Sequence, residues 1–131
     1  MTEKEKLQKR LKEIKEKEWN DIIEKHYPEF KKLEGKCFKV RNSYSLPKSE
    51  DNYWWYYVKI LKIKKDYLYE GYGNILSHYD GMFFQEDENG EIRIDFNYGN
   101  YVHSLEDENE ISTEEFSKIW NNLLNKINNW K

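Results

Sequence analysis

The segment Tyr53–Lys64 constrains the fold of this chain more than any other, because aromatic and β-branched residues dominate it. Side chains of these kinds favour an extended strand with one buried face. Val58 and Ile60 follow the two-residue period of a strand, and Leu61 breaks it before Ile63 resumes it. One extra residue at this point predicts a β-bulge, which bends a strand. The middle of the chain therefore predicts a bent strand within a sheet.

Shorter segments of similar character lie on both sides of this strand. Asn89 and Gly90 stand near the tip between two of them, and Asn-Gly between alternating strands is the strongest short signal for a hairpin. The stretch 46–52 has the composition of a loop. The further predicted strands are Lys36–Tyr44, Tyr67–Tyr72, Met82–Glu86, Glu91–Phe96 and Tyr101–Leu105.

The N-terminal segment Thr2–Lys25 predicts a helix, since good helix formers dominate it and glycine and proline are absent. Leu7, Leu11 and Ile14 recur at spacings of four and three residues, so they form a narrow apolar seam on that helix. We expect the N-terminal half of the helix, which holds this seam, to project from the domain or to pair with another helix or molecule. Pro28 is expected to end or kink the helix, because the residue before a proline is pushed out of the α region.

A second helix is predicted at the other end of the chain. Ser112 and Glu115 have the spacing of a capping box, with Ser112 as N-cap. A wide amphipathic face follows and predicts that this helix packs on the core. Its apolar positions are Phe116, Ile119, Trp120, Leu123, Leu124 and Ile127.

These segments predict an α+β fold: an N-terminal helix, a small, strongly bent antiparallel sheet or SH3-like barrel of five to six strands, and a C-terminal helix. With 131 residues the chain fits a single domain, 1–131, because two pieces would each be too small for a stable core. Its parts are a helical region at 1–34, a sheet at 36–105 and a helix at 112–130. Charged residues make up 36% of the chain, but the 17% of aromatic residues supply enough burial to argue against disorder.

The sequence predicts a cytoplasmic protein. No apolar run approaches the roughly 20 residues that span a bilayer, and the first ten residues lack the apolar core of a signal peptide. The single cysteine, Cys37, has no partner for an internal disulfide and fits a reducing compartment. We expect it to be a small core residue, since no base that would activate it is near in sequence.

No catalytic motif is recognisable: the chain has no glycine-rich phosphate loop, nucleophile elbow or zinc-type cysteine pair. His78, Asp80 and His103 offer the ligand types of a metal site, but no motif of fixed spacing supports one. We expect no metal or other cofactor, and a protein that binds instead of catalysing.

Charge is distributed unevenly along the chain. Residues 1–65 hold 18 Lys and Arg against 11 Asp and Glu, a net charge of +7, whereas residues 66–131 have a net charge of −10. Such asymmetry indicates directed electrostatic contacts, unless folding interleaves the two halves. The acidic turns are the predicted contact for a basic protein partner, although solvated loops are the simpler explanation for such runs of charge. Their residues are Glu86, Asp87, Glu88, Glu91, Glu106, Asp107, Glu108 and Glu110.

A second function class is open. The N-terminal helix, together with lysines and tyrosines of the sheet, offers a surface on which single-stranded bases stack. The overall acidity of the chain weighs against it, because phosphate neutralisation carries most nucleic-acid affinity. The sheet residues in this alternative are Lys59, Lys62, Lys64, Lys65, Tyr67 and Tyr69.

In its size, its Lys/Glu/Asn/Ile/Tyr bias and its helix–sheet–helix order, the chain resembles accessory proteins of phages and mobile elements, including anti-CRISPR and other anti-defence proteins. The resemblance is compositional and covers the whole chain. It implies a stoichiometric inhibitor or adaptor that binds a host nucleic-acid-targeting complex. In this hypothesis the acidic turns meet a basic partner, and the seam of Leu7, Leu11 and Ile14 adds a second contact or forms a homodimer.

Overall fold

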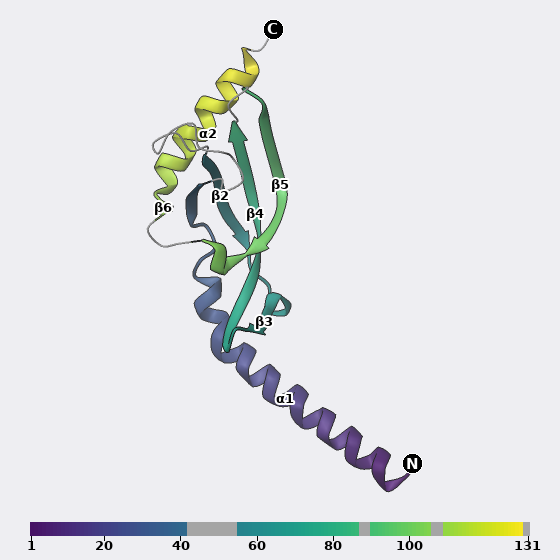
Figure 1. Ribbon diagram of the computed structural model, residues 1–131. Coiled ribbons are helices and arrows are strands. Elements are labelled where there is room, and N and C mark those ends of the chain that lie inside the picture. The colour runs from purple at the N-terminus through teal and green to yellow at the C-terminus, as the bar shows by residue number, and fades with distance from the viewer. Residues whose placement is uncertain (42–54, 87–89, 106–108, 130–131) are drawn as a thin grey trace.

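The computed structural model describes residues 1–41, 55–86, 90–105 and 109–129, and these form two helices flanking an antiparallel sheet (Figure 1). The predicted α+β class and element order are confirmed. In chain order the elements are α1 (Glu3–Lys31), β1 (Cys37–Arg41), β2 (Trp55–Lys62), the 3-10 helix η1 (Lys65–Tyr67), β3 (Leu68–Gly71), β4 (Asn74–Glu86), β5 (Ile92–Tyr101), the 3-10 helix η2 (Val102–Ser104), β6 (Glu110–Ile111) and α2 (Thr113–Asn128).

The strand β4 organises the sheet, because it pairs antiparallel with β2, β3 and β5. Val58 of β2 lies opposite Phe83, and Leu68 of β3 lies opposite Ser77. The β2–β4 register shifts between Ile60 and Lys62, which confirms the bulge predicted at this point. The predicted hairpin is also confirmed, as β4 and β5.

The sheet is open, so the closed-barrel form of the prediction is wrong. Its strands run in the order β3-β4-β2-β1-β6, and β5 pairs with β4 outside this path. Among the described residues no pairing joins β5 to β6 and closes the sheet. The strand β6 has two residues, which leaves little backbone for a further pairing.

One face of the sheet packs against the end of α1. Val58, Ile60 and Tyr79 are buried in this core, with Tyr27 and Phe30 of α1 packed against it. The hydroxyl of Tyr27 donates a hydrogen bond to the carbonyl of Ile63, with an O···O distance of 3.1 Å. The C-terminal part of α1 is therefore fixed to the sheet by both apolar and polar contacts.

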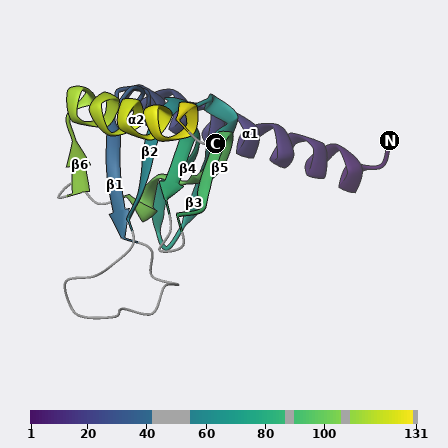
Figure 2. The same ribbon diagram turned by 90° about the horizontal axis from the view of Figure 1, so that it is seen from above.

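The other face packs against α2, which lies along one side of the sheet (Figure 2). Phe116 and Leu123 of α2 are buried with Phe84 and Cys37 of the strands. The Ser112 hydroxyl accepts a hydrogen bond from the Glu115 backbone N–H at 3.0 Å, which confirms the predicted N-cap.

Pro28 does not end the first helix, one of the two outcomes predicted for it, because α1 continues through it to Lys31. Proline removes one helical N–H and so frees a carbonyl one turn earlier. Pro28 is exposed, so water can reach the disturbed turn. The helical hydrogen bonding resumes at once, with the Pro28 carbonyl accepting from the Lys32 N–H at 3.3 Å.

Strand boundaries differ from the predicted ones in the second half of the sheet. The strand β4 begins at Asn74, eight residues before the predicted Met82, because polar side chains and Gly81 interrupt the apolar pattern. The predicted strand Tyr101–Leu105 is wrong, since Val102–Ser104 form η2. The strand β6 was not predicted, and the predicted loop 46–52 lies outside the described residues.

Within the described part of the chain, no helix combines the length and apolar character needed to cross a membrane.

Gly81 is a packing constraint that tests this arrangement. A Cβ at this position would lie 2.9 Å from the carbonyl oxygen of Lys59 and 2.9 Å from Tyr79 Cε2. We therefore expect Gly81→Ala to lower the free energy of unfolding by about 1–3 kcal/mol. Gly99→Ala is the matched control in β5, because the nearest atom to its Cβ is 3.9 Å away. Urea denaturation measures both, and equal effects of the two substitutions would contradict the packing.

Candidate partner-binding surfaces

A partly exposed group of aromatic rings and histidines lies around the β3–β4 turn and the end of β5. We call Tyr69, Tyr72, His78, Tyr101 and His103 the aromatic–histidine cluster. The His78 ring centroid lies 4.4 Å from that of Tyr101 and 4.9 Å from that of Tyr69. The ring centroids of Tyr101 and His103 are 5.2 Å apart. These contacts form a continuous strip of rings.

Strand register brings these residues together. His78 of β4 lies directly opposite Tyr101 of β5, and side chains in such a pair share one face of the sheet. Tyr69 of β3 is paired with Leu76, two residues before His78, so it lies diagonally beside that histidine. The helix η2 then places His103 beside Tyr101.

Tyr72 occupies the tip of the β3–β4 hairpin in an unusual backbone conformation. Its φ is +53° and that of Gly73 is +76°, between the paired residues Gly71 and Asn74. A two-residue hairpin turn of this kind favours Asn-Gly, because a non-glycine side chain is strained at positive φ. The Tyr72 side chain is nevertheless 93% exposed, so core packing does not explain a tyrosine at this position.

Two tyrosines at or beside this surface, Tyr69 and Tyr67, have raised pKa values. The Tyr69 hydroxyl lies 3.4 Å from His103 Nδ1, and its pKa is raised by burial and by the nearby Tyr101. The Tyr67 hydroxyl donates to Asp80 at 2.6 Å, and this hydrogen bond raises the pKa of Tyr67. The phenols are therefore hydrogen-bonding groups at physiological pH, not nucleophiles.

The three residues considered as metal ligands separate into two environments. His78 and His103 both stack on Tyr101, whereas the Asp80 carboxylate accepts from Tyr67. Across the described ranges, no three His, Cys, Asp or Glu side chains are grouped as a metal site requires.

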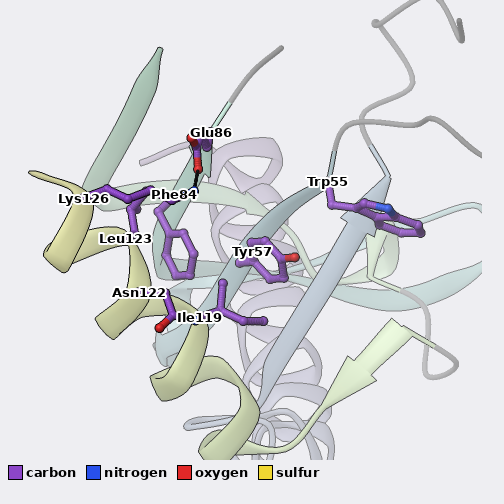
Figure 3. Close-up of a pocket in the computed structure, with 8 residues that line it drawn as sticks. All are labelled: Trp55, Tyr57, Phe84, Glu86, Ile119, Asn122, Leu123 and Lys126. Atoms are coloured by element: carbon purple, nitrogen blue, oxygen red, sulfur yellow. Dashed lines mark hydrogen bonds and ion pairs between the residues drawn. The ribbon is translucent and has the colours of Figure 1, made fainter. Parts of the chain in front are cut away.

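A cleft of about 340 Å³ lies between α2 and the sheet (Figure 3). The Tyr57 and Phe84 rings stack at 5.1 Å, and the side chains of α2 face them. An ion pair borders the cleft, with Lys126 Nζ 2.7 Å from Glu86 Oε2. Burial, and secondarily Glu115, raises the pKa of Tyr57. Its lining residues are Trp55, Tyr57, Phe84, Glu86, Ile119, Asn122, Leu123 and Lys126.

The predicted acidic turns are only partly described. Glu86 is paired with Lys126, and Glu110 is paired with Lys36 at 3.0 Å, so both carboxylates are partly neutralised within the chain. Glu91 is exposed. The remaining predicted residues, Asp87, Glu88, Glu106, Asp107 and Glu108, lie outside the described residues.

The residues predicted for nucleic-acid binding do not form one basic strip. Lys65 forms an ion pair with Glu24 at 2.7 Å on the α1 side. Lys64 lies 5.4 Å from the Tyr67 ring centroid, beside the Tyr67–Asp80 hydrogen bond. Lys59 is half-buried, Lys62 is opposite Asp80 in the β2–β4 register, and Tyr69 belongs to the aromatic–histidine cluster.

The predicted seam on the first helix is exposed. Residues 1–18 are all exposed, and the N-terminal half of α1 extends away from the sheet in both views (Figures 1 and 2). Leu7, Leu11 and Ile14 are 65%, 53% and 48% exposed. Net charge on α1 is small, since residues 1–31 hold nine Lys and Arg and eight Asp and Glu.

Cys37 is a core residue, as predicted. Its side chain is fully buried, and burial raises the pKa of its thiol. The thiol donates a weak hydrogen bond to the Gly35 carbonyl at 3.7 Å. A buried thiol of raised pKa is not a reactive nucleophile.

Sequence reasoning did not single out Tyr72 and Tyr101 as surface residues. The Tyr-Gly pair between two strands was the available signal for Tyr72, because it places a tyrosine where a hairpin turn prefers Asn. The sequence around Tyr101 gives no such signal, because its position beside His78 depends on the register of β4 and β5.

Comparison with known proteins gives no relative: no protein-family model, curated protein or solved structure matches the chain.

The strain at Tyr72 can be measured directly. We expect Tyr72→Asn to raise the free energy of unfolding by about 0.5–1 kcal/mol, because Asn tolerates positive φ and Asn-Gly suits this turn. Thermal or urea unfolding of the two proteins measures the change. A loss of stability would show that the Tyr72 ring contributes more to folding than its backbone conformation costs.

Proposed function

We propose that this protein is a protein-binding domain, acting as an adaptor or stoichiometric inhibitor, with the aromatic–histidine cluster as its main contact surface. Tyr72 is the observation that carries the proposal. A tyrosine that is 93% exposed at a strained turn position contributes little to folding, and exposed tyrosines supply contact area at low entropic cost.

The composition of the cluster supports a protein partner. Tyrosine is enriched in the central parts of protein interfaces, where rings bury large areas and hydroxyls find hydrogen bonds. Tyr101 is 44% exposed and lies at the centre of the ring contacts, as an anchoring residue does in a contact surface.

Local charge favours protein over nucleic acid as the partner. Asp66, Glu70 and Asp80 lie on the segments that carry the cluster, and they offset Lys62 and Lys64. Stacking of bases requires a positively charged groove that follows the backbone. A nucleic-acid-binding module is therefore the alternative that we place second.

In a narrower form of the proposal, the partner is a host nucleic-acid-targeting defence complex such as CRISPR–Cas. Its support is the compositional resemblance to phage accessory proteins and the net charge of −10 on residues 66–131, which suits a basic groove.

Affinity capture from a bacterial lysate that contains defence systems tests the proposal. We expect a partner protein to bind the wild-type chain in stoichiometric amounts. Combining Tyr72→Asn with Tyr101→Ala in the chain is expected to weaken its affinity for this partner about tenfold or more. Phe96→Ala is the matched control, since Phe96 is an exposed aromatic residue of β5 outside the cluster. Equal binding by the double variant and the control would contradict the assignment of the surface.

Nucleic-acid binding is tested separately with labelled single- and double-stranded oligonucleotides. We expect no saturable binding to the isolated protein at about 0.15 M salt, because the lysines near the cluster are offset by carboxylates. Tight, salt-dependent binding that Tyr101→Ala abolishes would instead favour the nucleic-acid-binding module.

A further inference from the structure

The apolar seam of α1, formed by Leu7, Leu11 and Ile14, lies on a different side of the helix from the residues that pack on the sheet. With about 100° of rotation per residue, each of the three lies about 100–160° around the axis from Tyr27 and Phe30. The seam is on the half of α1 that extends away from the sheet (Figure 1). The packing of α1 on its own sheet therefore leaves the seam uncovered.

The projecting half is a well-formed helix, and its residues 3–18 are all exposed. The Thr2 hydroxyl accepts a hydrogen bond from the Glu5 backbone N–H at 3.1 Å, and Glu3 and Glu5 lie in the first turn, where negative charge is favourable. The seam is therefore presented on a capped, regular helix, which reduces the ordering that a partner must impose.

The residues that border the seam are predominantly basic. Leu7 and Ile14 are seven residues apart and so occupy the same core position of a heptad, while Leu11 occupies the other core position. In this register the positions that flank the core hold Gln8, Arg10, Lys15 and Lys17. A groove of about 420 Å³ lies beside the seam, and its lining residues are Gln8, Leu11, Lys12, Lys15, Glu16 and Trp19.

This pattern does not suit a second copy of the chain. A parallel pair that stacks all three apolar residues on their equivalents would place Arg10 of each helix against Lys15 of the second copy. An antiparallel pair would set Ile14 against Lys4, or Leu7 against Glu18, depending on register. Each arrangement opposes like charges or places a charged residue against an apolar one.

We infer that the seam binds an amphipathic helix of a protein partner whose own apolar seam is flanked by Asp and Glu. Acidic flanks complement Arg10, Lys15 and Lys17, and a narrow seam of this kind is the geometry of helix pairing. The inference rests on the proposed protein-binding function and describes the chemistry of a second contact.

The test uses the full-length protein and two labelled synthetic peptides of three heptads, with leucine at the core positions and either Glu or Lys at all flanking positions. Fluorescence anisotropy at about 50 mM salt is expected to show at least about tenfold tighter binding of the Glu peptide, with the preference falling at about 0.5 M salt. Leu11→Glu is expected to abolish binding, while circular dichroism reports whether the helix is kept.

A matched pair of charge reversals isolates the flanks. The double substitution Arg10→Glu with Lys17→Glu is expected to remove or reverse the preference for the Glu peptide. The control, Lys6→Glu with Lys9→Glu, changes the net charge by the same amount away from the seam and is expected to keep this preference. Equal binding of both peptides, equal effects of the two reversals, or a Leu11-dependent dimer in sedimentation equilibrium would overturn the inference. If neither peptide binds while capture still depends on Tyr72 and Tyr101, the seam inference fails and the proposed function stands.

Discussion

The pairing of β4 with three other strands is the interaction on which the rest of the structure depends. One strand of 13 residues carries the hydrogen bonds that hold β2, β3 and β5. Its side chains alternate between the two cores, with Tyr79 buried toward α1 and Phe84 buried toward α2. Gly81 lies where the β2 backbone and the Tyr79 ring approach most closely, so the strand has no room there for a side chain.

The two helices cover the two faces of this sheet only in part. The end of α1 covers one face around Tyr79, and α2 covers the other around Phe84. Around His78 of β4, the aromatic–histidine cluster and the β3–β4 turn lie where no helix packs on the described part of the sheet. The first half of α1 extends beyond the sheet (Figure 1). Among the exposed surfaces that the structure describes, the aromatic–histidine cluster and the Leu7–Leu11–Ile14 seam are the two to which we assign binding functions.

Local chemistry predicted a large part of this fold. The capping box at Ser112, the bulge at Leu61 and the hairpin after β4 each depend on neighbours in sequence, and all three were predicted. The N-terminal half of β4 was not, because its exposed face holds His78 and Asp80 and does not read as a strand. The helix α1 continues through Pro28, and the neighbouring Tyr27 and Phe30 pack on the sheet, a tertiary contact that the local sequence does not reveal. The aromatic–histidine cluster depends on the registers of β3, β4 and β5, so no single segment could have revealed it.

Hydrogen exchange of the protein alone and in complex with a captured partner measures which surfaces the partner covers, since protection reports where the partner contacts the chain. We expect protection on binding to be concentrated in residues 69–78 and 99–104, around the aromatic–histidine cluster, with a second protected region at residues 7–17. Protection confined to α2 and the cleft beside it, with no change at the β3–β4 turn, would show that the partner does not bind through the aromatic–histidine cluster.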